Sequence, residues 1–181
     1  MLNPKKIPNV IILVEGENEE SYWRAMRYLG RAKKFNLWHA TNAKLNSLLR
    51  AIKGDEQIII IADTDQLAEI NNFIHSVSRI KKHCTLAPLI ILQYKNFEEE
   101  LCYSCTCTIN DLYKHFNAMG LANLKTNINQ EKQLSKKLDS INHQKSLMWS
   151  RSIQDMPMKF SNIGNLIGDY DVLVDKNIII N

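Results

Sequence analysis

Long hydrophobic runs are missing from this sequence. The longest apolar runs cover residues 10–14 and 58–62, whereas a transmembrane helix needs about 20 consecutive apolar residues. The phosphate-binding pattern G-x-x-x-x-G-K-[ST] is also absent. We therefore expect no membrane partner, and no ATPase site of that type within this sequence.

Cysteine and histidine are scarce. The four cysteines fit a reduced, cytoplasmic protein better than a disulfide framework. Cys102 and Cys105 have the C-x2-C spacing of half a zinc site, but no second such pair follows. We therefore favour core packing for these cysteines and keep zinc as the alternative. The five histidines share no spacing with a nucleophile, so we expect surface or capping roles for them.

Positive charge is modest and unevenly spread. The 181 residues, 45% of them apolar, suffice for one well-buried core and carry a formal charge of +4. Residues 110–160 contain eight Lys or Arg and four Asp or Glu, so the rest of the chain is neutral overall. A basic segment beside an acidic site suits a polyanion, because Lys and Arg bind phosphates while carboxylates hold metal. The alternative is a solvated helical face.

Strand-length apolar runs alternate with segments of helical periodicity in the first half of the chain. Near-continuous apolar strands separated by amphipathic helices indicate a parallel sheet covered on both faces, with right-handed crossovers. We therefore predict an α/β fold with a roughly four-stranded parallel sheet flanked by helices. The predicted strands are 10–14, 35–39, 57–62 and 89–92, and the predicted helices between them are 18–34, 42–53 and 66–83.

The second half of the chain is predicted to be mostly helical. Helical periodicity covers residues 96–107, 109–119 and a basic stretch at 130–148. Residues 170–180 contain two apolar runs, which predict a hairpin or an added terminal strand. We expect a core over 8–108 and a helical, basic C-terminal extension over 109–181, packed on the same domain.

Two of the predicted strands end in acidic residues. Glu15 and Gly16 follow the first strand, with Glu19 one turn later, and Asp63 and Asp65 follow the third. Side chains at i and i+2 of an extended chain point the same way, so the two aspartates can aim at one point. The carboxyl ends of parallel strands meet at one edge, where open α/β sheets place their sites. We therefore expect an acidic cluster there, with helix caps or solvated turns as the alternative.

These carboxylates are the ligands that magnesium prefers. Mg²⁺ takes hard oxygen ligands and is usually held by one or two carboxylates plus waters and substrate phosphate. Asp63 and Asp65 supply such a site, and Glu15 is a further ligand or a general acid/base. With Mg²⁺ or Mn²⁺ polarising a phosphoryl oxygen, cleavage of a phosphodiester becomes possible.

The arrangement resembles the Toprim domain, which topoisomerases, primases and several nuclease families share. The resemblance rests on Glu15-Gly16 after the first strand and on Asp-Thr-Asp at 63–65, across about residues 10–105. The Toprim resemblance implies the α/β sheet described above.

Two further segments resemble one branch of that superfamily. VEGENEESYW is similar to the E-G-x-T-E opening of the OLD and RloB-like branch of bacterial anti-phage nucleases, with Asn18 in place of Thr and Glu19 as the second acid. Phe97-Glu98, with Leu101 after it, resembles the F-E-x-W-L segment of RloB-like proteins.

The resemblance implies a role for each acidic residue. Asp63 and Asp65 would bind the metal. Glu15 would be the catalytic or ligating glutamate, and Glu19 would complete a second metal position. Glu98 would be an additional acid, either a ligand or a residue that orients the loop. Relatives with this layout cleave nucleic acid with magnesium or manganese, often beside an ABC-type ATPase.

Basic residues outside the acidic cluster are candidates for nucleic-acid contacts. Lys95 is expected near the carboxyl edge of the sheet, within reach of a scissile phosphate. Lys132 and Lys136 share a face of the predicted basic helix, and Trp149 is a candidate for stacking on a base. A partner-docking helix or plain surface is the alternative. The candidates are Lys95, Lys132, Lys136, Lys137, Lys145 and Arg151.

The sequence therefore predicts a metal-dependent nuclease, and the resemblance suggests the effector of a bacterial anti-phage system. One alternative is a non-catalytic Toprim-fold subunit that docks on an ABC-type ATPase. Another is an RNA-processing enzyme resembling ribonuclease M5. The sequence does not decide whether the substrate is DNA or RNA, what activates the protein, or whether the chain forms a homo-oligomer.

Overall fold

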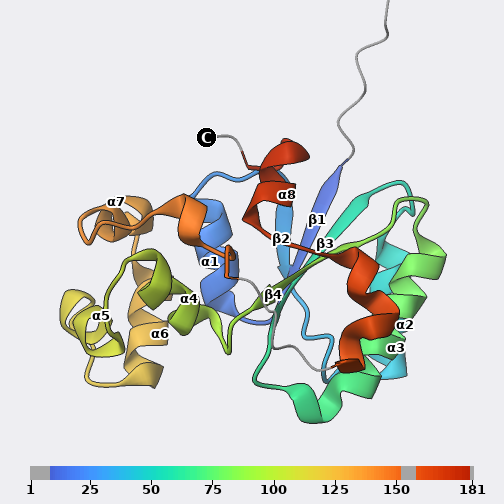
Figure 1. The fold of residues 1–181 in the computed structure, drawn as a ribbon, viewed down its shortest axis with the longest axis horizontal. Helices are drawn as coiled ribbons and strands as arrows, with labels where there is room; N and C mark the ends of the chain where they lie inside the picture. The colour runs from blue at the N-terminus through green and yellow to red at the C-terminus, as the bar shows by residue number, and fades with distance from the viewer. Residues whose placement is uncertain (1–8, 152–157, 180–181) are drawn as a thin grey trace, which may run out of the picture.

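A single parallel sheet organises the chain. The computed structural model describes residues 9–151 and 158–179, and its five strands are all parallel in the order β2-β1-β3-β4-β5 (Figure 1). The strands are β1 Val10–Val14, β2 Arg31–Lys34, β3 Gln57–Asp63, β4 Leu89–Gln93 and β5 Ile167–Gly168. The α-helices are α1 Glu17–Ala25, α2 Asn42–Ala51, α3 Ile70–His83, α4 Phe97–Ser104, α5 Ile109–His115, α6 Leu121–Gln130, α7 Leu134–Asp139 and α8 Tyr170–Asp175, with short 3-10 segments at Leu67–Glu69, Lys145–Leu147 and Met158–Leu166.

Two hydrophobic cores lie on the two faces of the sheet. Alternate strand residues point to opposite faces, so Ile12 and Ile59 join one core while Leu13 and Ile60 join the other. The first core contains α1 and α4 to α8, and the second contains α2, α3 and the segment from residue 160 to 166 (Figure 1). The predicted parallel α/β fold with both faces covered is confirmed, with five strands instead of roughly four.

The C-terminal extension shares its core with the sheet. Leu124 and Trp149 belong to the same buried cluster as Ile12 and Leu101. The boundary between 108 and 109 stays a prediction. No helix within the described ranges is both long and apolar enough to cross a bilayer.

The segment between β1 and β2 differs from the prediction. The predicted helix 18–34 ends at Ala25, because Arg27 and Gly30 adopt left-handed backbone angles, with φ of 57° and 96°. A side chain at Gly30 would also collide with Val10 and Ile12, at 2.7–2.8 Å. The strand predicted at 35–39 lies instead at Arg31–Lys34, a charged edge strand without an apolar pattern.

Two predictions for the C-terminal half are wrong. The basic helix predicted over 130–148 is interrupted: α6 ends at Gln130 and α7 covers only Leu134–Asp139, so Lys132 lies outside α7. Residues 170–175 form α8, whose first turn is capped by Asp169 accepting from Val172 N at 3.2 Å, in place of a hairpin. The added strand is β5, immediately before it, and residue 180 lies outside the described residues.

Candidate active site

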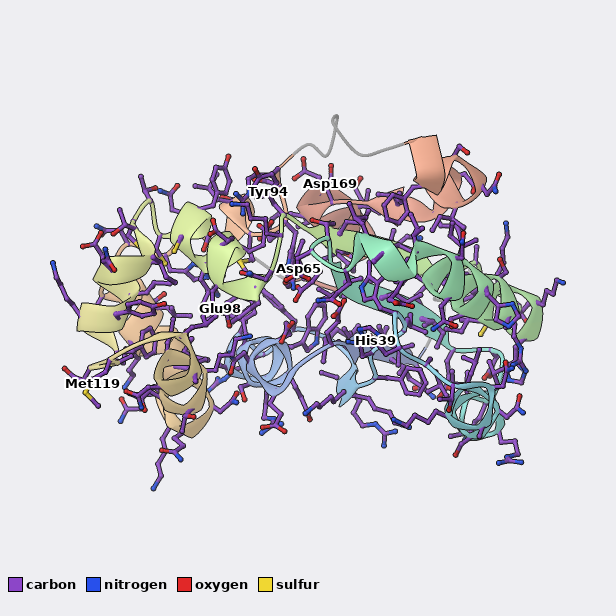
Figure 2. All side chains as sticks on the ribbon, turned by 90° about the horizontal axis from the view of Figure 1, so that it is seen from below. His39, Asp65, Tyr94, Glu98, Met119 and Asp169 are labelled. Carbon is purple, nitrogen blue, oxygen red and sulfur yellow. The ribbon has the colours of Figure 1, made fainter. Side chains whose placement is uncertain are left out.

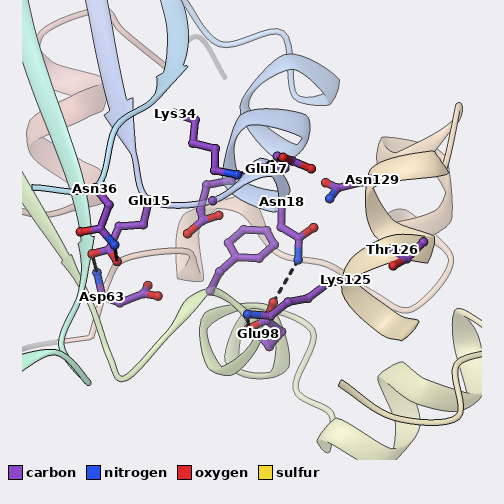
Figure 3. A pocket seen from close by; sticks show the side chains of 13 residues that line it. Glu15, Glu17, Asn18, Lys34, Asn36, Asp63, Glu98, Lys125, Thr126 and Asn129 are labelled. Atoms are coloured by element: carbon purple, nitrogen blue, oxygen red, sulfur yellow. Dashed lines mark hydrogen bonds and ion pairs between the residues drawn. The ribbon is translucent and has the colours of Figure 1, made fainter. Parts of the chain in front are cut away.

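An acidic pocket of about 430 Å³ opens at the carboxyl ends of β1 and β3 (Figure 3). The strand order reverses between these two strands, and such a switch point is where open α/β sheets form a crevice for ligands. Four of the five acids predicted for the site line this acidic pocket, together with Glu17 and two lysines. They are Glu15, Glu19, Asp63 and Glu98, and the lysines are Lys34 and Lys125.

Glu15 is held by three donors. Its carboxylate accepts from Asp63 N at 2.7 Å, from Trp38 Nε1 at 2.5 Å and from Asn36 Nδ2 at 3.2 Å. Burial raises the pKa of Glu15 to about 7, against the lowering effect of these hydrogen bonds, and the charges of Glu19 and Asp65 add to the rise. Glu15 therefore exchanges its proton near neutral pH.

Asp63 is the most strongly perturbed acid of the pocket. Burial raises its pKa to about 9, and the neighbouring carboxylates of Glu15 and Glu19 contribute further. Its Oδ1 accepts from Gln93 Nε2 at 2.5 Å. These carboxylates therefore disfavour one another's negative charge, which is the electrostatic condition for binding a cation.

Gln93, at the end of β4, connects the acids to the core. Its side chain is fully buried, and Nε2 also lies 3.4 Å from Glu19 Oε1 while Oε1 accepts from Trp149 Nε1 at 3.1 Å. Burial raises the pKa of Glu19, and the charge of Glu98 adds to the rise. Gln93 thus positions two carboxylates with one amide.

Asn18 and Glu98 form the other wall of the pocket. Asn18 Nδ2 donates to Glu98 Oε1 at 3.0 Å, and Lys125 Nζ lies 3.6 Å from Glu98 Oε2. Both side chains are at least 95% buried, yet Asn18 Oδ1 and Glu98 Oε2 have no hydrogen-bond partner among the described residues. Buried polar atoms are normally satisfied, so the unpartnered Asn18 Oδ1 and a Glu98 Oε2 that has only the long ion pair with Lys125 point to a ligand that offers donors or positive charge.

Asp65 lies outside the acidic pocket. β3 ends at Asp63, so the extended geometry that would align the two aspartates does not continue to Asp65. Its exposed carboxylate accepts from Gln66 Nε2 at 3.0 Å, although its charge still contributes to the raised pKa values of Glu15 and Asp63. Figure 2, viewed toward the carboxyl edge, shows Asp65 near the middle of that face.

The donor chemistry of the pocket suits a hard divalent cation. Among residues 9–151 and 158–179, no group of three or more His, Cys, Asp or Glu side chains is arranged to hold a metal. Mg²⁺ needs only one or two carboxylates with waters, and Asn18 Oδ1 and the Glu98 carboxylate offer further oxygens for it. Asp63 and Glu15 would lose their protons to solvent when a cation binds.

The predicted phosphate-binding residues do not gather at the acidic pocket. Lys95 is exposed in the loop after β4, and its carbonyl accepts from Thr64 N and Asp65 N, which places it at the carboxyl edge. Lys132, Lys136 and Lys145 line a pocket of about 440 Å³ with Arg27, at the far end of α1. A nine-residue helix spans about 13 Å, so these lysines lie toward the opposite edge of the sheet.

The remaining basic candidates and Trp149 have structural partners. Lys137 pairs with Glu131 at 3.6 Å and Arg151 with Glu100 at 3.2 Å. Trp149 is 2% exposed, so the hypothesis that it stacks on a base is wrong. Cys105 packs in the core, and burial raises the pKa values of Cys102 and Cys105 to about 12, which favours the thiol over the metal-binding thiolate.

Several residues of the site were missed in the sequence. Gln93 carried a usable signal, because a polar residue ends an otherwise apolar strand at the carboxyl edge. Trp38, Asn36 and Lys125 reach the site through tertiary packing and left no local pattern. Searches of protein-family models, curated protein sequences and solved structures found no match to this chain.

Proposed function

We propose that this protein is a metal-dependent nuclease that cleaves phosphodiester bonds with Mg²⁺ or Mn²⁺. The observation that carries the proposal is the acidic pocket at the switch point, where Glu15, Glu19 and Asp63 all have raised pKa values. Structural carboxylates are normally paired with cations, whereas these face one another. Perturbed carboxylates in a cleft are typical of functional sites.

The acids and Asn18 would hold the cations. Asp63 and Glu15 would hold a cation, with Glu19, Glu98 and Asn18 offering oxygens for a second one. When bound, the cation would polarise the phosphoryl oxygen and stabilise developing negative charge.

Other groups would move the proton and hold the substrate. As the alternative to holding the cation, Glu15, whose pKa is about 7 in the cation-free protein, can accept and return a proton near neutral pH. The exposed ammonium groups of Lys34 and Lys125 can hold phosphate oxygens at the pocket rim.

The Toprim assignment, the anti-phage role and the ABC-type ATPase partner belong to the same proposal. They are supported by the motif resemblance, in particular Glu15-Gly16 and Glu19 after β1 and Asp63 at the end of β3. The side-by-side placement of β1 and β3 is compatible with that resemblance, since both acidic ends come to one edge.

The test is cleavage of labelled duplex DNA, single-stranded DNA and RNA with Mg²⁺ or Mn²⁺. We compare wild type with Asp63→Asn and with Asp55→Asn, which makes the same chemical change in the exposed turn before β3. Cleavage lost with chelator and in Asp63→Asn, by about 1000-fold or more, but retained in Asp55→Asn is the expected result. Equal activity in both variants, or no cleavage by wild type with any substrate, would contradict the proposal.

A further inference from the structure

A basic groove of about 480 Å³ adjoins the acidic pocket. The two share Glu15, Lys34 and Asn36 in their walls, so they form neighbouring parts of one surface. Away from the shared wall, the polar lining of the basic groove comes from Lys33, His39, Lys44 and Ser47, with Phe35 and Leu48 between them.

Three separate elements bring these side chains together. Lys33 and Lys34 end the edge strand β2 and pair in register with Leu13 and Val14, directly before Glu15. Adjacent strands lie about 4.8 Å apart, so the backbone of β2 runs alongside the segment that leads into the acidic pocket. His39 follows in the loop, and Lys44 comes from the first turn of α2.

The groove cations are available to a ligand. Lys34 Nζ donates to Glu17 Oε1 at 3.0 Å across an exposed rim. Within the described ranges, the ammonium groups of Lys33 and Lys44 make no ion pair with any carboxylate. Binding a phosphate at Lys33 and Lys44 would break no existing ion pair, whereas at Lys34 the phosphate would compete with Glu17.

We propose that the basic groove binds the phosphate backbone of the nucleic-acid strand whose scissile phosphate enters the acidic pocket. The inference rests on the proposed nuclease function and specifies where its substrate lies. Lys33 and Lys44 hold phosphates on one side of the cut, and Lys34 stands at the junction. The surface assigned to the substrate is therefore β2 and α2, and not the segment from 132 to 151.

A simpler explanation covers only part of the observation. Charged residues on an edge strand prevent pairing with another chain, which would account for lysines on β2. It does not account for Lys44, which comes from α2, or for the opening of the groove onto Glu15. A substrate path accounts for both.

The experiment measures equilibrium binding of labelled single-stranded DNA, duplex DNA and RNA in EDTA, at several salt concentrations. The variant is Lys33→Gln/Lys44→Gln. The matched control is Lys81→Gln/Lys82→Gln, which removes two exposed lysines from the last turn of α3, at the opposite edge of the sheet. Thermal unfolding checks that both variants fold.

We expect about tenfold weaker binding for the groove variant, and a slope of log K against log salt that is shallower by about 1.4–1.8. The control should stay within about twofold of wild type. Equal weakening of both variants, unchanged binding of the groove variant, or no binding by wild type overturns the proposal. If wild type cleaves nucleic acid but the groove variant binds normally, the nuclease function is retained and the groove is not its substrate path. If the groove variant alone binds more weakly but wild type cleaves no substrate, the groove is retained and the nuclease function is rejected.

Discussion

The buried carboxylate of Glu100 and the acidic pocket have different surroundings. Glu100, 1% exposed, accepts from Tyr94 N at 2.6 Å and from Trp149 N at 3.2 Å, and Arg151 lies 3.2 Å away. In the acidic pocket, Asp63 faces Glu15 and Glu19, and the two lysines that line the pocket, Lys34 and Lys125, are half exposed. The protein balances the negative charge of Glu100 with donors and Arg151, whereas it leaves the negative charge of Glu15, Glu19 and Asp63 unbalanced.

We infer that Glu100 has a structural role and that the acids of the pocket have a functional one. Burial raises the pKa of Glu100, but two backbone N–H groups and Arg151 oppose the rise, so the carboxylate ties residues 149–151 to α4. The acids of the pocket retain an electrostatic strain that only a proton or a cation relieves. The four predictions below test this contrast, from the largest expected effect to the smallest.

Glu100→Ala should lower the free energy of unfolding by about 3 kcal/mol, because it leaves Arg151 and two buried N–H groups without their acceptor. Urea unfolding measures the change. Glu99→Ala, a half-buried neighbour in the same turn, is the matched control and should change stability by less than about 0.5 kcal/mol. A small effect of Glu100→Ala would show that this carboxylate is not structural.

Asp63→Asn should stabilise the protein at pH 8, by about 2 kcal/mol or about 4–8 °C in Tm. The folded pKa of Asp63, about 9, lies above the ordinary aspartate value of 3.8, so between these pH values the folded state holds a proton that the unfolded state has lost. Wild-type stability therefore falls as pH rises from about 4 to about 9, and the gain from the amide grows over that window. Thermal unfolding at pH 4 and pH 8 checks this. A gain that is independent of pH would contradict it.

Mg²⁺ should stabilise wild type at pH 8, by about 1.4 kcal/mol at a concentration of about ten times its Kd. The shift should disappear in Asp63→Asn and persist in Asp55→Asn and Glu99→Ala, as read by Tm with and without Mg²⁺. Loss of the shift in all variants would point to nonspecific ion effects.

Lys125→Gln should lower stability by about 0.5 kcal/mol or less, since its ammonium is half exposed and screened by solvent although Glu98 is buried. High salt should remove the difference from wild type. A salt-independent loss of several kcal/mol would mean that Glu98 is as fully balanced as Glu100.

The sequence was most informative where apolar pattern and chemistry coincide. β1, β3 and β4 are continuous apolar runs buried on both faces, so their existence and the meeting of Glu15 with Asp63 were predictable. β2 was misplaced because an edge strand needs no apolar face and Arg31–Lys34 resembles a helix end. The position of Asp65 depended on where β3 stops, and the basic groove depended on β2, so neither was predictable from local sequence.

Trp149 links the C-terminal half of the chain to the acids of the pocket. Its Nε1 donates to Gln93 Oε1, and the same amide group holds Asp63 and Glu19, while its backbone N binds Glu100. The C-terminal half therefore supplies a buried brace for the acids of the N-terminal half. A fragment cut after residue 108 would keep every predicted acid but lose the brace that orients them. The C-terminal half is therefore part of the site's support. A chimera that takes this half from a homologous protein would also need the end of β4 from that protein.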